Sequence, residues 1–242
     1  MDQSALISRF HELKDDSGEF EQLRDDLYLF KKWNWDYQQT LDFQKACHQF
    51  IQEHPDKRIL ILCNHPTCFT MGRGLQKKAG KVIEGLVPTE ETGNLPFPCY
   101  KINRGGGLTY HYPGQLIIYP ILKLGGKNPS LSELSDLLFD PIIKAAQEHS
   151  NLTLSKKRGD LIGLWTEGES SQKVASFGIG IERFITQHGI AVNIEDGEIF
   201  SALKQMYPCG LEGRVYSYFN QVSDSLVSVD QVALSFLKYS QI

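Results

Sequence analysis

Residues 104–115 read RGGGLTYHYPGQ, a glycine-rich turn with polar side chains around it. Three glycines in a row lose backbone entropy on folding, which makes sense where a ligand must approach the main chain closely. Amide N–H groups in such a turn can hold an oxyanion or a polar linker. Directional hydrogen bonds around that group would come from four side chains, Arg104, Thr109, His111 and Gln115. A tight β-hairpin turn with satisfied polar neighbours is the simpler alternative.

The sequence on either side of this turn predicts a mixture of strands and helices. Short apolar runs predict strands at residues 27–30, 58–63, 99–103, 115–122, 152–155, 160–166, 174–182 and 190–194. Capping residues and apolar spacing predict helices at residues 37–53, from Ser130, at 198–206 and from Ser228. Pro141 is expected to kink the second of these helices. Strands in hairpins with helices between them indicate one α/β (α+β mixed) domain.

Two stretches depart from this regular pattern. Residues 1–26 are charge-rich, with Leu6, Phe10 and Leu13 at helical spacing, so we expect an N-terminal helical appendage before a single domain over 27–242. Residues 71–98 hold several glycines and prolines, which predicts a long exposed loop. Loops of such length in a compact domain are usually functional or mobile.

The composition is that of a globular protein, and the N-terminus predicts a cytoplasmic one. Hydrophobic residues make up 41% of the 242 residues, enough to bury a sizeable core. The first residues are polar and acidic, unlike a signal peptide, and no apolar run is long enough to predict a membrane span. The net charge of −4 gives no general attraction to nucleic acid.

The cysteines are spread along the chain and odd in number. There are five, and none of them forms a CxxC pair, which argues against both a disulfide framework and a zinc site. We therefore expect free thiols and no metal. Each cysteine is by default a small buried hydrophobic residue.

Three further segments carry candidate reactive groups. Lys173 opens the apolar run KVASFG, His188 opens HGIAVN, and Cys209 lies in PCGL. A cysteine between proline and glycine sits in a constrained turn that can present its thiol. Taken singly, however, a lysine of this kind can extend to solvent, a lone cysteine is more often inert, and a lone histidine is most often structural.

In this order and spacing, RGGGLTYHYPGQ, KVASFG, HGIAVNI and PCGL resemble the octanoyltransferases of lipoate biosynthesis. The resemblance covers roughly residues 27–240, and the stretch from His65-Pro66 to Gly72-Arg73 is similar to an early motif of the same family. It implies the catalytic fold shared with lipoate and biotin protein ligases, in which a mixed, largely antiparallel sheet has flanking helices. Residues 27–242 would then be the octanoyltransferase catalytic domain.

The resemblance also implies roles for single residues. The nucleophile falls on Cys209 and its activating lysine on Lys173, because an ammonium within hydrogen-bonding reach favours a thiolate. The implied substrate-binding residues are Arg104, Gly105, Gly106, Gly107, Leu108, Thr109, Tyr110, His111, Ser176, Phe177, Gly178, Gly189, Ile190 and Ala191. Leu108, Phe177 and Ile190 are candidates to line the acyl chain, and a core role is equally compatible with each of them.

The implied reaction moves an octanoyl group from octanoyl-acyl carrier protein to a specific lysine of lipoyl domains, through an acyl-cysteine thioester. The acceptors would be the lipoyl domains of 2-oxoacid dehydrogenases and the glycine cleavage H protein. No cofactor is expected, because the donor carries its own phosphopantetheine arm. No nucleic-acid or membrane partner is expected either. Acyl carrier protein and lipoyl domains are generally acidic, and two clusters of basic residues could bind them. The first cluster comprises Arg73, Lys77, Lys78, Lys81, Lys101 and Arg104, and the second comprises Lys156, Lys157 and Arg158. A solvated surface explains such clusters about as well.

Four alternatives remain open at the level of sequence. An ATP-dependent lipoate or biotin protein ligase uses the same scaffold without a nucleophilic cysteine, and a lipoyl amidotransferase takes its acyl group from another carrier domain. A Cys–His hydrolase would use His111 or His188 as its base. A carrier-binding module without catalysis would not need Cys209 at all.

Overall fold

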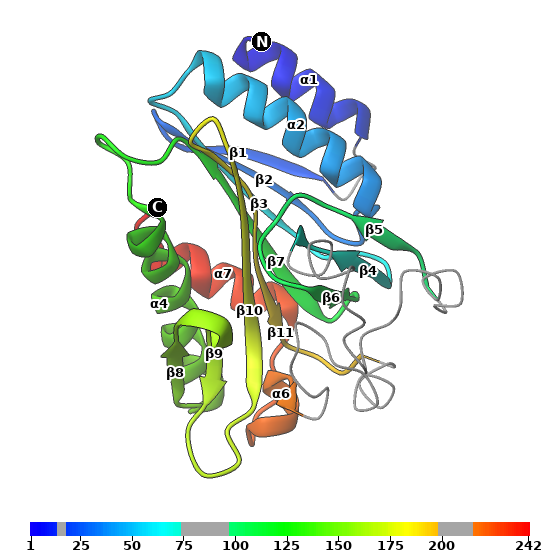
Figure 1. Ribbon diagram of the computed structural model, residues 1–242, viewed down its shortest axis with the longest axis vertical. Coiled ribbons are helices and arrows are strands. Elements are labelled where there is room, and N and C mark those ends of the chain that lie inside the picture. The colour runs from blue at the N-terminus through cyan, green and yellow to red at the C-terminus, as the bar shows by residue number, and fades with distance from the viewer. Residues whose placement is uncertain (14–17, 74–96, 198–214) are drawn as a thin grey trace.

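The computed structural model describes residues 1–13, 18–73, 97–197 and 215–242. They form three layers, a central sheet with helices on each of its two faces (Figure 1). The strand order of this eight-stranded sheet is β1-β2-β3-β7-β11-β10-β9-β8. Its strands are β1 Glu19–Arg24, β2 Leu27–Lys32, β3 Arg58–Cys63, β7 Gln115–Leu122, β8 Leu154–Lys157, β9 Gly163–Thr166, β10 Lys173–Glu182 and β11 Ile185–Asn193. Within it β2 and β3 are parallel and the other neighbouring pairs are antiparallel, so the predicted fold class is confirmed.

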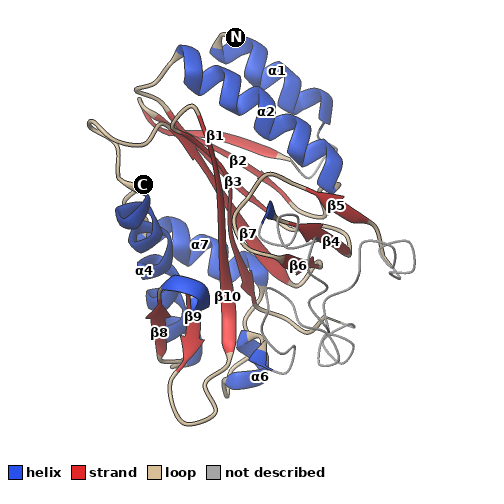
Figure 2. Cartoon of the chain, in the orientation of Figure 1, coloured by secondary structure: helices blue, strands red, loops and turns tan. Residues whose placement is uncertain are grey.

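Helices cover both faces of the sheet (Figure 2). On one face lie α1 Gln3–Leu13 and α2 Tyr37–Glu53, and on the other lie α4 Leu131–Ser150 and α7 Val229–Tyr239. Side chains along a strand point alternately to the two faces. In β3, Ile59 and Ile61 accordingly join the core under α1 and α2, whereas Leu60 and Leu62 join the core under α4 and α7.

The helix ends follow the capping residues that the sequence contains. The Asp36 side chain accepts a hydrogen bond from the Gln39 amide, and Ser130 and Ser228 each form a full capping box. The helix that begins after Ser130 contains Pro141 and continues through it to Ser150. Two short helical segments of the described residues were not predicted, α6 Phe219–Val222 and the 3-10 helix η2 Gly159–Leu161. The latter replaces the start of the strand predicted at 160–166, which begins only at Gly163.

A second, three-stranded sheet carries the glycine-rich turn, and its strand pairing rules out the alternative of a tight β-hairpin turn. Its strands are β4 Cys68–Met71, β5 Cys99–Lys101 and β6 Leu108–His111, in the order β5-β4-β6. The predicted strands 99–103 and 115–122 do not form a hairpin around the turn, because β5 pairs with β4 whereas β7 belongs to the large sheet. The turn instead leads from β5 into β6, which pairs with the other side of β4.

The N-terminal segment packs against the same central sheet. Leu6 and Phe10 of α1 are fully buried, and the Phe10 ring contacts the rings of Phe30, Trp35 and Phe43. After α1, strand β1 pairs antiparallel with β2 and forms one edge of the sheet.

Some sequence predictions fall on parts of the chain that the structure does not describe. The predicted helix at 198–206, most of the predicted loop at 71–98 and Cys209 all lie outside the described residues. Among the helices in the described ranges, none combines the length and apolar character needed to cross a membrane.

Candidate active site

The glycine-rich turn lies directly on the middle of β10. The Gly105 amide donates a hydrogen bond of 3.2 Å to the carbonyl of Ile179. A Cβ atom on Gly180 would lie 2.4 Å from the carbonyl oxygen of Asn103, closer than real contacts allow. Glycine at position 180 is therefore needed for the turn to approach the strand.

Arg104 anchors the turn through a buried guanidinium group. Its Nη2 donates to the Thr70 carbonyl (3.0 Å), to Thr70 Oγ1 (2.8 Å) and to Thr109 Oγ1 (2.7 Å), and its Nη1 donates to the Gly105 carbonyl (2.8 Å). All four acceptors are neutral, and no carboxylate pairs with Arg104 in the part of the chain that the structure describes. Within the described residues, the positive charge that holds the turn has no ion-pair partner, and it favours electron-rich groups nearby.

The two other predicted substrate-binding sets lie side by side on neighbouring strands. Residues 176–178 of β10 pair with residues 189–191 of β11, in the register Ser176 with Ala191, Phe177 with Ile190 and Gly178 with Gly189. The turn reaches this place as well, since a Cβ atom on Gly178 would lie 3.0 Å from Arg104 Cδ. Segments from three regions of the sequence therefore meet at one place on the sheet.

Several of the predicted site residues also have clear structural roles. Leu108 is buried with Phe69, Tyr110 and Tyr112 in the core of the small sheet, and Ile190 belongs to the core under α4 and α7. A Cβ atom on Gly189 would lie 1.9 Å from the Ile118 carbonyl oxygen, so strand packing alone requires this glycine. Phe177 is partly exposed, and of the three proposed acyl-lining side chains it is the one that is not fully committed to a core.

His111 is buried and has a partner on each ring nitrogen. Its Nδ1 lies 2.7 Å from Gln115 Oε1 and its Nε2 lies 3.1 Å from Thr70 Oγ1. Burial, the neighbouring His65 and Arg104 hold the pKa of His111 well below its usual range. A neutral imidazole with both nitrogens occupied is poorly placed to act as the base of a hydrolase.

Two more buried histidines share this environment. His65 donates from Nδ1 to the Trp35 carbonyl and accepts at Nε2 from the Tyr119 hydroxyl, and burial lowers its pKa to about 4. Burial and Arg104 lower the pKa of His188 to about 3. All three histidines are therefore neutral in the folded protein near pH 7.

These histidines predict acid lability. Below a pH of about 6.5 the unfolded chain binds protons that the folded protein excludes, so the free energy of unfolding should fall by about 1.4 kcal/mol per pH unit for each such histidine. At pH of about 5 the three together would remove about 6 kcal/mol, which is comparable with the total stability of many domains. Denaturant unfolding at a series of pH values between 7.5 and 5 measures this slope.

A matched variant isolates one of the three histidines. His188 has a φ of 59°, a conformation that asparagine tolerates, so His188→Asn should keep the backbone while removing one titrating group. We expect its stability to fall less steeply with acid than that of the parent. An unfolding free energy independent of pH over this range would contradict the assignment of buried neutral histidines.

Lys173 begins β10 and is buried between aromatic rings. Its Nζ lies 5.7 Å from the centroid of the Trp165 ring and 5.9 Å from that of Tyr216. Trp165 pairs with Lys173 across β9 and β10, and Tyr216 forms an isolated bridge with Lys173 on its other side. The lysine therefore does not extend to solvent, and its ammonium is held at a fixed place within cation–π range.

Gly163 provides the space for the Lys173 side chain. It has a φ of 149°, and a Cβ atom there would lie 2.7 Å from Lys173 Cε and 2.2 Å from the Ala175 carbonyl oxygen. Gly163→Ala should therefore displace the lysine and lower the rate of the acyl transfer that the resemblance implies at least about tenfold. The unfolding free energy should also fall by about 2 kcal/mol because of backbone strain.

The control for this variant is Gly168→Ala. Gly168 also has a positive φ, of 108°, but an added Cβ atom would meet nothing within 4 Å. It should show strain without a loss of transfer rate, as measured by enzyme assay and denaturant unfolding. Equal transfer rates for the two variants would contradict the role assigned to Gly163.

Four of the five cysteines are described, and none has the environment of a reactive thiol. Cys47 and Cys63 are fully buried, and burial raises the pKa of both thiols well above the usual value. Burial also raises the pKa of Cys68 to about 12 and that of the half-buried Cys99 above its usual value. A protonated thiol is a weak nucleophile, so these four cysteines are poor candidates for catalysis.

One cysteine does lie beside a histidine. Cys63 Sγ is 3.8 Å from His65 Nε2, in the interior of the protein. Burial raises the pKa of this thiol and lowers the pKa of this imidazole, which is the reverse of an activated thiolate–imidazolium pair. This pair is therefore structural.

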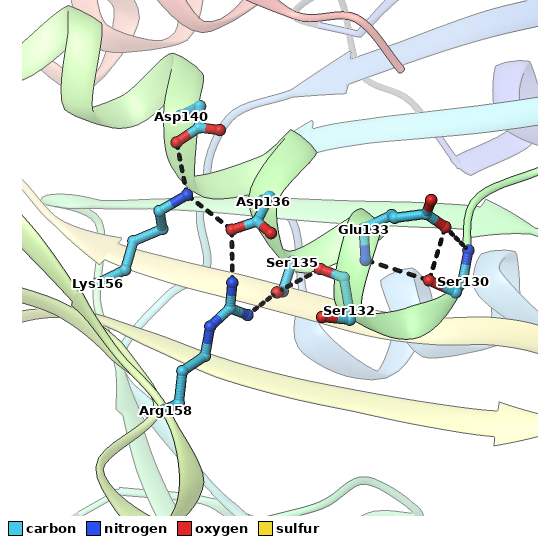
Figure 3. Close-up of polar contacts among 8 residues, drawn as sticks. All are labelled: Ser130, Ser132, Glu133, Ser135, Asp136, Asp140, Lys156 and Arg158. Atoms are coloured by element: carbon cyan, nitrogen blue, oxygen red, sulfur yellow. Dashed lines mark hydrogen bonds and ion pairs between the residues drawn. The ribbon is translucent and has the colours of Figure 1, made fainter.

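The second basic cluster is largely neutralised by helix α4. Lys156 forms ion pairs with Asp136 (2.6 Å) and Asp140 (2.8 Å), and Arg158 pairs with the same Asp136 oxygen (2.6 Å) (Figure 3). The third member, Lys157, lies over the Trp165 ring, with its Nζ 4.0 Å from the centroid. These contacts reduce the positive charge that the cluster offers to an acidic partner.

The first basic cluster is described only in part. Arg73 and Lys101 are exposed, whereas Arg104 is buried and belongs to the turn rather than to the surface. Lys77, Lys78 and Lys81 lie outside the described residues.

Three residues that hold this site together could not be identified from the sequence motifs alone. Thr70 contacts both Arg104 and His111, and Asn193 contacts Gln115. Asn193 ends the segment HGIAVN, but its place opposite Gln115 appears only once β7 and β11 are paired. Gly163 likewise acquires its meaning only when β9 lies beside β10.

Comparison with known proteins places the chain among lipoylation enzymes. Residues 36–241 match the family model described as the lipoyl protein ligase A/B catalytic domain. The octanoyltransferase of Parasynechococcus marenigrum (strain WH8102) is 36% identical over 177 residues, which are 71% of this chain and 68% of that protein. The octanoyltransferase of Bacteroides fragilis (strain ATCC 25285) is 33% identical over 175 residues, 71% of this chain and 75% of that protein.

Solved structures give the same fold. A lipoate-protein ligase A bound with ATP superposes with a TM-score of 0.62 at 14% identity, covering 90% of this chain and 84% of that chain. A bipartite lipoate protein ligase of Thermoplasma acidophilum, studied with its E2 lipoyl domain, gives a TM-score of 0.53 at 13% identity, covering 81% of this chain and 76% of that chain. At such identities the likeness concerns the fold alone, which is the one that the sequence motifs implied.

Proposed function

Because the chain belongs to the lipoyl protein ligase A/B catalytic domain family, we propose that it transfers an octanoyl group from octanoyl-acyl carrier protein to a lysine of lipoyl domains. Three curated relatives at 33% to 36% identity are octanoyltransferases whose match extends over two thirds or more of both chains. The structural observation that carries the proposal is Lys173, a buried lysine held at the start of β10 beside aromatic rings.

The proposed nucleophile is Cys209. Support comes from the PCGL motif and from the other four cysteines, whose burial raises their pKa values. In the first half-reaction its thiolate attacks the thioester carbonyl, a new C–S bond forms and the bond to the pantetheine sulfur breaks. The Lys173 ammonium gives its proton to the departing thiolate, which leaves an octanoyl-cysteine and a neutral lysine.

The second half-reaction returns the enzyme to its starting state. The acceptor lysine has a reference pKa of about 10.4, so at neutral pH it must lose a proton before it can attack. That first proton goes to solvent, and the neutral amine then attacks the acyl-cysteine. Neutral Lys173 takes the second proton from the attacking nitrogen as the C–S bond breaks and the amide C–N bond forms. Cys209 leaves as a thiolate beside the ammonium of Lys173, ready for the next donor.

The donor brings the chemistry that would otherwise need a cofactor. An acyl thioester is already activated, so the proposed reaction uses neither ATP nor a metal, and the phosphopantetheine arm arrives with the carrier protein. We propose the lipoyl domains of 2-oxoacid dehydrogenases and the glycine cleavage H protein as acceptors, in the cytoplasm. The exposed Arg73 and Lys101 are the described basic side chains best placed to speed the encounter with such acidic proteins.

The test of this function is transfer without ATP. Purified protein is mixed with octanoyl-acyl carrier protein and a lipoyl domain, and the mass of the domain is followed over time. We expect the domain to gain one octanoyl group without nucleotide. Modification only from free octanoate with ATP would make the chain a ligase, as its fold neighbours are, and modification only from an octanoylated carrier domain would make it an amidotransferase.

A further inference from the structure

A continuous chain of buried hydrogen bonds starts at the glycine-rich turn. Arg104 Nη2 donates to Thr70 Oγ1 at 2.8 Å, and the same hydroxyl lies 3.1 Å from His111 Nε2. On the far side of the ring, His111 Nδ1 lies 2.7 Å from Gln115 Oε1. These four side chains are 5% exposed or less, so each of these polar groups depends on its protein partner.

The same chain continues to the start of β10, where Lys173 lies. Gln115 Nε2 donates to Asn193 Oδ1 at 2.8 Å, and Asn193 Nδ2 donates to the Ser217 carbonyl at 2.9 Å. The Ser217 amide in turn donates to the Lys173 carbonyl at 3.0 Å. A path of hydrogen bonds through β4, β6, β7 and β11 thus joins the two halves of the proposed active site.

The direction of every bond in this path is fixed by its ends. A guanidinium group can only donate and a carbonyl oxygen can only accept. Asn193 therefore presents Nδ2 to the Ser217 carbonyl and Oδ1 to Gln115, so Gln115 presents Oε1 to His111. A neutral His111 must then donate from Nδ1 and accept at Nε2, so Thr70 donates to His111 while it accepts from Arg104. The amide groups of Gln115 and Asn193 then have one orientation each, so a substitution that reverses or removes one bond disturbs the whole path.

We propose that Gln115 and Asn193 are positioning residues for octanoyl transfer, which hold the Arg104 turn and the Lys173 end of β10 in one relative geometry. This inference rests on the proposed function. Neither residue is among the substrate-binding residues that the resemblance implies, and the Gln115 amide, a candidate ligand contact by sequence, is occupied by His111, Tyr110 and Asn193. Both residues therefore act through others. Asn193 is the more direct of the two, because one residue separates its amide from the Lys173 backbone.

Ser217 is the point through which Asn193 acts. The segment around it bridges to β10, with Tyr216 beside Lys173, and the Tyr216 ring is one of the two that face the Lys173 ammonium. Loss of the hydrogen bond from Asn193 would leave the buried Ser217 carbonyl without this donor, which is energetically unfavourable. The segment around Ser217 would therefore move until the carbonyl finds another donor. Such a shift moves the ring and the Lys173 backbone together.

Two substitutions at one position test this role. Asn193→Leu removes both hydrogen bonds at similar size. Asn193→Asp keeps the shape, and its carboxylate still accepts from Gln115 but cannot donate to the Ser217 carbonyl. Once protonated, however, that carboxyl group donates again, so lowering the pH should restore the bond in this variant alone.

The matched control is Thr186→Val on the same strand. Thr186 is fully buried, and its hydroxyl donates to the Pro120 carbonyl at 2.6 Å and accepts from the Leu122 amide at 3.0 Å. Its removal costs a comparable number of buried hydrogen bonds, but Thr186 is not part of the path. It reports what a purely structural loss does to the enzyme.

The readouts are single-turnover acylation by octanoyl-acyl carrier protein, with its rate and half-saturating donor concentration measured separately, and the unfolding free energy. We expect Asn193→Leu to slow acylation about a hundredfold at saturating donor, with half-saturation changed much less, as for a misplaced reacting group. Thr186→Val should lose similar stability and keep its rate within about threefold of the parent. The rate of Asn193→Asp relative to the parent should rise as the pH falls.

The outcomes separate this inference from the function on which it rests. A parent protein that is never acylated would overturn the proposed function. A parent that is acylated, with Asn193→Leu no slower than Thr186→Val, would overturn the positioning role alone. If Asn193→Leu does not fold, the pH dependence of Asn193→Asp decides, because a relative rate that stays constant or falls with acid contradicts the donor role of Asn193.

Discussion

Cys209→Ala should form no acyl-enzyme and transfer no octanoyl group. If the reaction passes through a thioester on this sulfur, the variant retains every other group and still lacks the atom that becomes acylated. Intact-mass measurement after mixing with octanoyl-acyl carrier protein should find one octanoyl adduct on the parent and none on the variant.

The control for this experiment is Cys99→Ala. Cys99 is the one half-buried cysteine among the four that the structure describes, and burial raises the pKa of its thiol. We expect the adduct to form on this variant as on the parent. An adduct that persists in Cys209→Ala, or that disappears in Cys99→Ala, would move the nucleophile away from Cys209.

Lys173→Ala should cause the second large loss of acylation rate. The lysine is proposed to stabilise the thiolate and to carry the proton in both half-reactions, a role worth about 10² to 10⁴ in rate. Without the ammonium, the Cys209 thiol should return toward its ordinary pKa of about 8.5. Acylation of the variant should therefore be slow at neutral pH and recover in part as the pH rises through this value.

Lys157→Ala is the matched comparison. Lys157 lies against the same Trp165 ring as Lys173, at 4.0 Å from its centroid, but it is not proposed to touch the reacting atoms. Its removal should leave the acylation rate within about threefold, as for most substitutions away from a reacting centre. Rapid acylation of Lys173→Ala at neutral pH would contradict the pairing of lysine and cysteine.

The elements that follow from sequence are those whose signals are local. Asp36, Ser130 and Ser228 cap their helices as predicted, because a cap needs only a side chain and the amide three residues on. The apolar run at 58–63 becomes β3 at the centre of the sheet, where both faces are buried. The helical spacing of Leu6 and Phe10 likewise gives α1.

The elements that do not follow from sequence depend on long-range pairing. β4 and β6 come from opposite sides of the glycine-rich turn, and neither was predicted as a strand. They pair across the turn in a sheet that β5 completes. A cross-strand partner such as Gln115 for Asn193 cannot be read from periodicity. The glycines of the motifs indicated where chain segments come close together but not what each glycine does. Gly189, for example, is required because a side chain there would collide with the Ile118 carbonyl.

The site follows the same division. Motifs predicted that residues 104–111, 176–178 and 189–191 belong together. The structure pairs 176–178 with 189–191 and sets Arg104 and Gly105 against β10, whereas 108–111 form a strand of the small sheet. Their roles toward substrate remain predictions. Taken singly, Lys173 could equally have extended to solvent, and its burial between Trp165 and Tyr216 is what makes its side chain unusual.

The most direct test of the account is a chase of the acyl-enzyme. The protein is acylated with octanoyl-acyl carrier protein, freed of donor, and mixed with a lipoyl domain without ATP, and peptides from both proteins are followed by mass spectrometry. We predict that octanoyl disappears from the Cys209 peptide as it appears on one lysine of the domain, in equal amounts. An acyl group that stays on the enzyme while the domain is modified only when donor is present would contradict it.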